Sequence, residues 1–416
     1  MKRYFASIAA CTLMLGFFST SPAKAGEVVW PTFMWAEANN APFLNELKRT
    51  FEKDNPGDVI KNITIPIATF WDKQFVDVAS GNSPDIATMY DPEIRTYLEA
   101  DLLEPLDKYL EAANIKVSEF VPTSKLAQKD GKIYAIPYQN NPRALFYNER
   151  LLRAAGIQPP QNAEDFLKAI RALRNPGSQQ FGFMNIAKPS GAALTYIEIM
   201  PIVAGFGGGF FKGGKPSANA PETVSALRFL KTLYDEQLTP RVDNPTYKQM
   251  FAEGRVATYA AGAFMASVVE GINKNTYSDL KSEVLPLPSG RTISVTVFFG
   301  IPKSAKDKDL AAKVLIRMLR DDMQSQLAVL GKTIPGRLGT IPIGFARENP
   351  WFEAFEQAAK TAVSYAPDGA EKYGAEIMKV VADHYEQMLF RGVSAEETAN
   401  NLQKALTDFI EEKAKN

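Results

Sequence analysis

The chain has 416 residues with 47 basic and 47 acidic side chains, one histidine and one cysteine. This charge balance argues against a nucleic acid or an anionic membrane as partner. The single histidine, His384, cannot supply the ligands of a zinc site, and a Ser-His-Asp triad would have to use this same residue. We therefore expect no metal, no other cofactor and no Ser-His-Asp chemistry. The length exceeds one typical hydrophobic core, which favours two lobes.

The N-terminus reads MKRYFASIAACTLMLGFFSTSPAKA, a basic start followed by an apolar run and small residues. This pattern is typical of a secretory signal peptide over residues 1–25, cleaved before Gly26. One alternative is a membrane anchor, but the run is shorter than the roughly 20 apolar residues that span a bilayer. The other is a lipoprotein box ending at Cys11, which few residues precede. We expect export to the periplasm as a soluble chain without disulfides.

Strand and helix patterns alternate through the first hundred residues. In chain order we expect a strand in 27–34, a helix in 39–53, a strand in 59–67, a helix in 70–80 and a strand in 85–90. This order is typical of βαβ units, and it predicts an α/β fold with a largely parallel sheet covered by helices on both faces.

The later elements are predicted from turn and capping residues. Asp130-Gly131 is a hairpin signal, and Asn162 followed by Asp165 is similar to a capping box. The glycine-rich stretch 205–210 lacks a P-loop Lys-Ser/Thr, so we interpret it as a bend and not as a nucleotide site. The other expected elements are helices in 148–155, 221–236 behind the cap candidate Asn219, 248–253, 305–330 and from 350 onward, and a strand in 292–301.

A set of segments carries a family resemblance. They read FLNELKRTFEKDNPG, VASGNSPDIATMYD, ADLLEPLDKYL, DGKIYAIP with LFYNERLLRAAGIQPP, GGKPSANAPETVSALRFLKTLYDE, MFAEGRVATYAAGAF and IPKSAKDKDLAAKVLIRML. In this order and spacing the chain resembles the family 1 extracellular solute-binding proteins of ABC importers, a group that includes maltose- and trehalose-binding proteins.

The resemblance implies a two-lobed periplasmic binding protein fold, type II-like, with a hinge and an interlobe cleft. Lobe 1 would comprise residues 26–139 and 286–333, and lobe 2 residues 140–285 and 334–416. It also implies a monomer that captures a small carbohydrate or a derivative and delivers it to an ABC permease of the inner membrane. No catalysis is expected.

The resemblance further implies a set of ligand-binding positions: Trp35, Glu37, Trp71, Asp91, Gln139, Asn140, Asn141, Gly262, Phe264 and Arg337. Aromatic rings cover the apolar faces of a sugar, and carboxylates, amides and guanidinium groups bind its hydroxyls. Structural roles stay open for several of them: Asp91 as a helix cap, Trp71 as a core residue and Arg337 as a surface ion pair.

Two departures from the family pattern leave the ligand open. Asn140 and Asn141 stand where many relatives carry an aspartate, and Phe264 replaces a tryptophan. One alternative is an anionic solute such as a glycerophosphodiester, with Arg337 as an anion contact. An alternative of another class is a secreted glycoside-active enzyme, because 47 acidic residues allow many carboxylate pairs.

Overall fold

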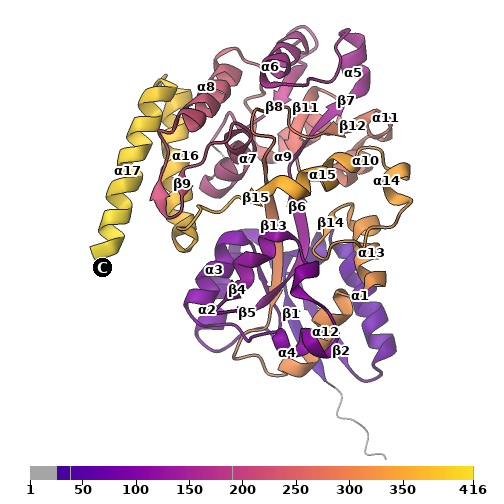
Figure 1. Cartoon of the computed structure of the whole chain (residues 1–416). Coiled ribbons are helices and arrows are strands. Elements are labelled where there is room, and N and C mark those ends of the chain that lie inside the picture. Colours follow the sequence, from indigo (N-terminus) through magenta and orange to yellow (C-terminus); the bar gives the residue numbers. More distant parts are fainter. Residues whose placement is uncertain (1–25, 38, 190, 416) are drawn as a thin grey trace, which may run out of the picture.

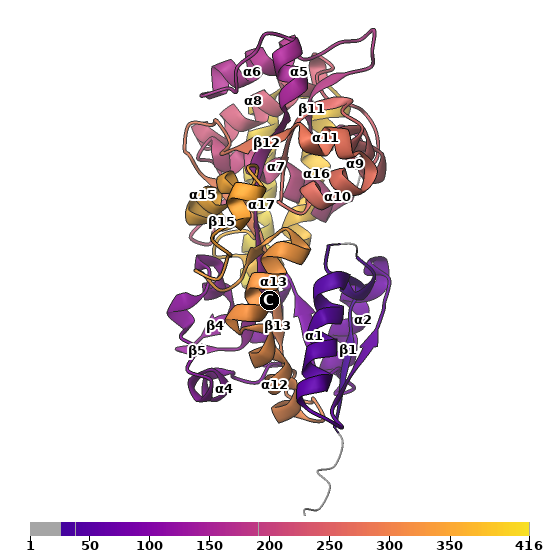
Figure 2. The same cartoon turned by 90° about the vertical axis from the view of Figure 1, so that its right-hand side faces the viewer.

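The computed structural model describes residues 26–37, 39–189 and 191–415. Residues 1–25, to which the signal-peptide prediction applies, lie outside the described residues. Two lobes are stacked along the long axis of the molecule, and strands run between them (Figures 1 and 2). In the described part of the chain, no helix combines the length and the apolar character needed to cross a bilayer.

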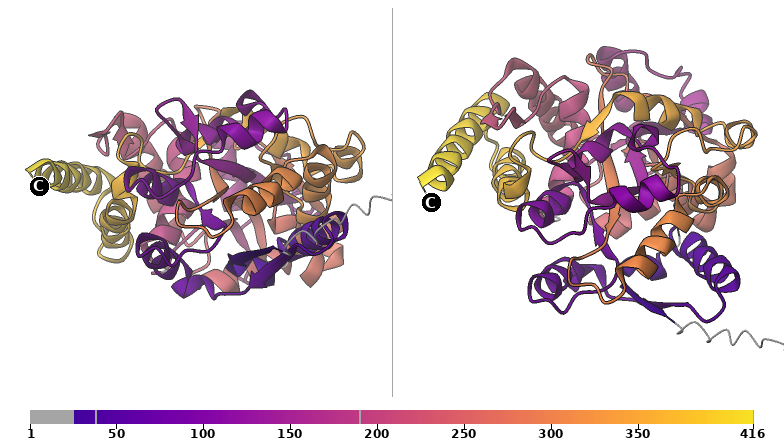
Figure 3. Two further views of the ribbon diagram at one scale, coloured as in Figure 1. Left: turned by 90° about the horizontal axis from the view of Figure 1, so that it is seen from below. Right: turned by 60° about the horizontal axis from the view of Figure 1, so that its bottom comes forward.

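The lower lobe in Figure 1, lobe 1, joins the N-terminal part of the chain to a later helical segment. Its elements are β1 (Glu27–Pro31), η1 (Phe33–Ala36), α1 (Ala41–Asp54), β2 (Val59–Ile63), α2 (Ile67–Ala79), β3 (Ala87–Met89), α3 (Asp91–Glu99), α4 (Asp107–Ala112), η2 (Val117–Glu119), η3 (Pro122–Ala127), β4 (Gln128–Lys129), β5 (Lys132–Ile133), α12 (Lys308–Met318) and α13 (Asp321–Gly331). Figure 3 shows the orange α12 alongside the indigo and purple N-terminal elements.

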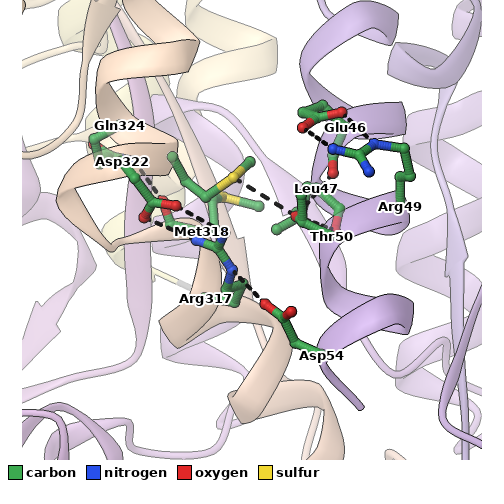
Figure 4. A network of polar contacts seen from close by, with 10 residues as sticks. Glu46, Leu47, Arg49, Thr50, Asp54, Arg317, Met318, Asp322 and Gln324 are labelled. Atoms are coloured by element: carbon green, nitrogen blue, oxygen red, sulfur yellow. Dashed lines mark hydrogen bonds and ion pairs between the residues drawn. The ribbon is translucent and has the colours of Figure 1, made fainter. Parts of the chain in front are cut away.

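Helix α1 shows how the sequence builds this lobe. Its apolar residues Phe43, Leu44, Leu47 and Phe51 share one face and are fully buried, as their spacing predicts. Polar contacts tie the later helices to this segment (Figure 4): the Thr50 hydroxyl approaches the Met323 sulfur at 3.9 Å, and Arg317 lies between Asp54 at 4.0 Å and Asp322 at 2.8 Å.

The upper lobe, lobe 2, surrounds a second hydrophobic core. Its elements are β7 (Ala144–Asn148), α5 (Glu149–Ala154), α6 (Ala163–Ala172), β8 (Phe181–Met184), α7 (Ala192–Gly205), β9 (Phe211–Lys212), β10 (Lys215–Pro216), α8 (Pro221–Asp235), α9 (Asn244–Ala252), β11 (Val256–Ala261), α10 (Met265–Ile272), α11 (Lys274–Ser278), β12 (Leu280–Glu283), α14 (Phe345–Glu348), α15 (Glu353–Thr361), β15 (Ala362–Ser364), η4 (Glu371–Tyr373), α16 (Gly374–Phe390) and α17 (Ala395–Lys415). Helix α17 lies at the outer edge of the lobe (Figure 1).

The α/β, two-lobed fold is confirmed, but the expectation of a largely parallel sheet is wrong. Strands β1 and β2 pair in parallel, as do β8 and β11. The pairs β3–β13, β6–β13, β7–β11 and β7–β12 are antiparallel. The reason is that strands distant in sequence enter each sheet, and such pairing is not set by the local βαβ pattern.

Three segments cross between the lobes: strand β6, strand β13 and the segment that contains strand β14. Strand β6 (Ala135–Pro142) is buried along its whole length and pairs with both β13 (Thr292–Gly300) and β14 (Ile334–Pro335). Within β13, Val295 belongs to the core of lobe 2 and Val297 to that of lobe 1. The return to lobe 1 therefore occurs inside β13 and not at the expected residue 286.

Local predictions differ in outcome. The Asp130-Gly131 hairpin and the Asn162 cap are present, with Asn162 Oδ1 accepting from Asp165 N at 2.9 Å. The cap candidate Asn219 is wrong, because α8 begins after Ala220 with Pro221 at its first turn. The single helix expected in 305–330 is two helices, which separate at 319–320. The C-terminal region is likewise divided into several elements.

Candidate ligand site between the lobes

Lobe 1 contributes the carboxylate of Glu37, whose pKa is affected by a positive charge in lobe 2. Glu37 follows η1, is half-buried and accepts a hydrogen bond from Asn40 Nδ2 at 2.7 Å. Burial raises the pKa of Glu37, while this hydrogen bond and the positive charge of Lys248 oppose the rise. Because Lys248 belongs to α9 of lobe 2, the two lobes share one electrostatic environment at this point.

The end of β3 and the first turn of α3 add an aromatic ring and a second carboxylate. Tyr90 packs against Trp71 of α2 with 4.7 Å between ring centroids. Three residues on, Glu93 has a buried carboxylate oxygen, Oε2, that no described group hydrogen-bonds. Burial raises the pKa of Glu93 to about 7, which backbone hydrogen bonds partly oppose. Glu93 Oε2 is therefore an available hydrogen-bond acceptor near the end of β3, and α/β sheets bind ligands at the ends of their strands.

Arg143 stands where β6 passes into β7. Its backbone N–H donates to Ile293 O at 2.9 Å, and its side chain is 6% exposed. The guanidinium Nη1 is buried without a hydrogen-bond partner among the described residues. Its Cζ lies 5.8 Å from the ring centroid of Phe264. A Cβ at Gly262 would lie 2.6 Å from Nη1, so the glycine makes room for the guanidinium.

Lobe 2 adds another acid and a lysine. Glu198 of α7 accepts from the Tyr259 hydroxyl, with its two oxygens at 3.1 and 3.2 Å. Burial raises the pKa of Glu198, opposed by the charges of Arg143 and Lys248. Lys248 Nζ lies 5.7 Å from the Phe264 ring centroid, and burial lowers its pKa. Arg143 and Lys248 thus lie beside the Phe264 ring, and the charges of both act on Glu198.

We call this group the junction site; its members are Glu37, Tyr90, Glu93, Arg143, Glu198, Lys248 and Phe264. Aromatic surface from both lobes lies beside charged donors and acceptors, some of which have no partner. Such a combination binds a small solute that has both apolar faces and polar groups. Closure of the lobes would bring the two halves of the site onto the same ligand.

The structure brings only some of the predicted residues into the junction site. Glu37, Gly262 and Phe264 belong to it or touch its members, and Trp71 borders it through Tyr90. Their contact with a ligand stays a prediction.

Asp91 lies behind the site. It is fully buried, and its carboxylate accepts from Thr296 N at 2.7 Å and from Ser364 Oγ at 2.6 Å. Burial raises its pKa to about 7, and the two hydrogen bonds oppose this rise. Asp91 therefore links α3 to strands β13 and β15, a structural role in place of the expected ligand contact.

The amides of the crossing strand are also engaged within the protein. Asn140 Oδ1 accepts from the Ser294 hydroxyl and from Thr296 Oγ1, and Asn141 Oδ1 accepts from Thr333 Oγ1 at 2.8 Å. Gln139, the first of the three, is 5% exposed. These contacts fix the crossing strands to one another.

Two further predicted residues make contacts with residues outside the junction site. Trp35 is 7% exposed, and its Nε1 donates to Trp30 O at 2.9 Å within the core of lobe 1. Arg337 ion-pairs with Glu119 at 2.7 Å and with Asp321 at 2.5 Å. The alternative interpretation of Arg337 as a surface ion pair fits these contacts, because its guanidinium group is held by two carboxylates of lobe 1.

Five members of the junction site escaped the sequence analysis. Tyr90 and Glu93 flank Asp91 and share its strand-end signal, so a broader reading of that motif would have included them. Arg143 directly follows the Asn-Asn-Pro crossing segment. No local signal marks Glu198 on α7 or Lys248 on α9. The residues that surround each side chain are determined by the tertiary fold and not by the adjacent sequence.

Replacement of Gly262 tests the geometry of the site. In Gly262→Ala the new methyl group would meet both Arg143 Nη1 and the Phe264 ring, at 2.6 and 2.9 Å. We expect ligand affinity to fall roughly tenfold or more, since overpacking costs about 1–3 kcal/mol, with a smaller change in the melting temperature. Titration calorimetry measures the first and thermal melting the second.

Gly271→Ala is the matched control, because a Cβ at this position in α10 meets nothing within 4 Å. It should leave affinity unchanged. Equal affinity of the Gly262 variant and the native chain would contradict the placement of Gly262 against the site.

Comparison with known proteins agrees with this architecture. A family model described as bacterial extracellular solute-binding protein matches residues 46–387. A binding protein from Brucella abortus is 27% identical over 74% of this chain and 75% of its own length, and the galactooligosaccharide-binding protein of Bacillus subtilis is 21% identical over 74% and 72%. The structure of UgpB from Mycobacterium tuberculosis with glycerophosphocholine superposes with a TM-score of 0.81 at 16% identity, covering 94% of this chain and 99% of that one. The chain belongs to the bacterial extracellular solute-binding protein family.

Proposed function

We propose that this protein is the periplasmic substrate-binding component of an ABC importer and that it captures a small carbohydrate or carbohydrate derivative without transforming it. The observation that carries the proposal is the composition of the junction site: Glu37 and Tyr90 come from lobe 1, and Lys248 and Phe264 from lobe 2. A ligand that contacts both halves stabilises the closed arrangement. The similarity to a galactooligosaccharide-binding protein supports the ligand class.

Carbohydrate binding fits the chemistry of the side chains. Tyr90 and Phe264 offer aromatic faces to the C–H surface of a sugar ring. The free oxygen of Glu93 accepts hydrogen bonds from hydroxyl groups, and Arg143 Nη1 donates them. Binding would therefore satisfy two buried polar atoms that lack a partner, which favours the bound state.

A melting screen of the chain from Gly26 onward tests the proposal. A ligand that binds only the folded state stabilises it by about 2.7 kcal/mol at a hundredfold excess over Kd. We expect selective stabilisation by some mono- or oligosaccharides, sugar acids or polyol derivatives, together with no turnover of aryl glycosides. Turnover that follows saturable kinetics would instead support the glycosidase alternative.

Truncation of Phe264 supplies the matched variant. We expect Phe264→Ala to weaken binding of the selected ligand by roughly tenfold or more, because a buried aromatic contact contributes about 2 kcal/mol at a binding hot spot. Phe390→Ala removes a ring that is 43% exposed in the same lobe and should leave affinity unchanged. Equal losses in the two variants would contradict a specific role for Phe264.

A further inference from the structure

The junction site contains a buried cation that no carboxylate of the described residues contacts directly. Arg143 is 6% exposed, and no carboxylate of the described residues forms an ion pair with it. Its Nη1 has neither a hydrogen-bond partner nor solvent around it. A guanidinium group remains charged at every physiological pH, so the cost of removing it from water cannot be relieved by loss of a proton. An unsatisfied group of this kind requires an explanation.

A second cation lies on the same aromatic ring. Lys248 is half-buried, and its Nζ is 5.7 Å from the Phe264 centroid, compared with 5.8 Å for Arg143 Cζ. Burial lowers the pKa of Lys248, the negative charge of Glu198 opposes this change, and the positive charge of Arg143 adds to it. Two like charges are thus held near each other without an ion-pair partner in the described part of the chain.

The nearby acids do not neutralise this pair by direct contact. Glu198 directs both oxygens to the Tyr259 hydroxyl, and Glu37 accepts from Asn40. Burial also raises the pKa values of Glu37 and Glu198, and it raises that of Glu93 to about 7, so part of the Glu93 carboxylates is protonated at neutral pH. The two cations beside the Phe264 ring therefore lack a direct carboxylate contact among the described residues, which leaves that place for an added anion.

We propose that the ligand of the junction site carries an anionic group, a carboxylate or a phosphate ester on a hydroxylated frame, which Arg143 and Lys248 bind beside the Phe264 ring. The inference rests on the proposed function and narrows its substrate class. Arg143 has the planar fork that binds such oxyanions through two parallel hydrogen bonds. The hydroxyl groups of the frame would then face Glu37 and Glu93.

Matched pairs of neutral and anionic probes test this inference by titration calorimetry and melting of the chain from Gly26 onward. The pairs are galactose with galacturonate, glucose with glucuronate, glucose with glucose 6-phosphate, and glycerol with glycerol 3-phosphate. We expect the anionic member of at least one pair to bind roughly tenfold or more tightly than its neutral partner, as charge-assisted hydrogen bonds allow. Which pair responds distinguishes a carboxylate from a phosphate ester. The advantage should shrink in 0.5 M NaCl, which screens charge.

Lys248→Met should remove most of the anionic advantage while it retains binding of the hydroxylated frame. Lys168→Met, at a side chain that is 63% exposed on α6, is the control and should keep the advantage. Binding of neutral members with equal or greater affinity overturns the inference and leaves the proposed function intact. Absence of binding by every member, and by neutral oligosaccharides as well, contradicts both. An anionic advantage that persists in Lys248→Met also overturns the role assigned to Lys248.

Discussion

Gly336→Ala should be among the most destabilising single substitutions in this chain. A Cβ at Gly336 would lie 1.9 Å from Pro137 O and 2.5 Å from Pro137 C. These are backbone atoms of β6, so no rotamer change can relieve the overlap. Gly336 N also donates to Tyr138 O at 3.1 Å, which holds the two crossing segments together. We expect a loss of about 3 kcal/mol or more in the free energy of unfolding, at the upper end of overpacking costs.

Chemical denaturation of the native chain and the variant measures this loss. Gly344→Ala is the control, because its added methyl group would meet only the Glu348 carboxylate at 4.0 Å. The free energy of unfolding of the control should lie within about 0.5 kcal/mol of that of the native chain, as is usual for surface substitutions. A native-like denaturation midpoint for Gly336→Ala would show that the segment containing β14 and Gly336 is not packed against β6.

Asp91→Ala should lower the free energy of unfolding nearly as much as Gly336→Ala. It removes the acceptor of Thr296 N–H and of the Ser364 hydroxyl in a fully buried place. An unsatisfied buried donor costs about 1–3 kcal/mol, and two are created here, so we expect a loss of about 3 kcal/mol in the free energy of unfolding. Asp91→Asn should lose less, because its amide can accept from Thr296 N and donate to Ser364 Oγ.

The same carboxylate makes stability depend on pH. Asp91 and Glu93 have pKa values of about 7 in the folded chain, compared with 3.8 and 4.5 for the ordinary groups. Between these values the folded state binds more protons than the unfolded state, so the free energy of unfolding falls as pH rises from about 4 to about 7. Melting should therefore occur at a higher temperature at pH 5 than at pH 7.5, and Asp91→Asn should show a smaller difference. A native chain that is more stable at pH 7.5 would contradict the raised pKa values.

Predictions that depend on neighbouring residues succeeded best. The buried face of α1 and the Asn162 cap are each set within a few residues, so the sequence contains all the information they need. The order of strands in the sheets could not be predicted in this way, because β13 pairs with β3 and β6, which lie far from it in the sequence. A βαβ pattern cannot reveal a strand that is inserted from so great a distance.

The site residues follow the same rule. Glu37 and Phe264 were found from motifs, while Lys248 became visible only when α9 was placed opposite the η1 loop. Asp91 has the sequence context of a ligand-binding acid, but Thr296 and Ser364 occupy its oxygens. Only the fold distinguishes a carboxylate that faces a ligand from one that joins strands.

The insertion of β13 also has a consequence for the order of folding. Phe299 pairs with both Thr88 and Ile136, so the sheet of lobe 1 stays incomplete until residues beyond 290 have joined it. Closing such long loops is slow. A chain truncated before β13 would leave the edges of β3 and β6 exposed, and open strand edges promote aggregation. Lobe 1 therefore cannot complete its sheet until most of the chain is available, although its own sequence begins at the N-terminal side.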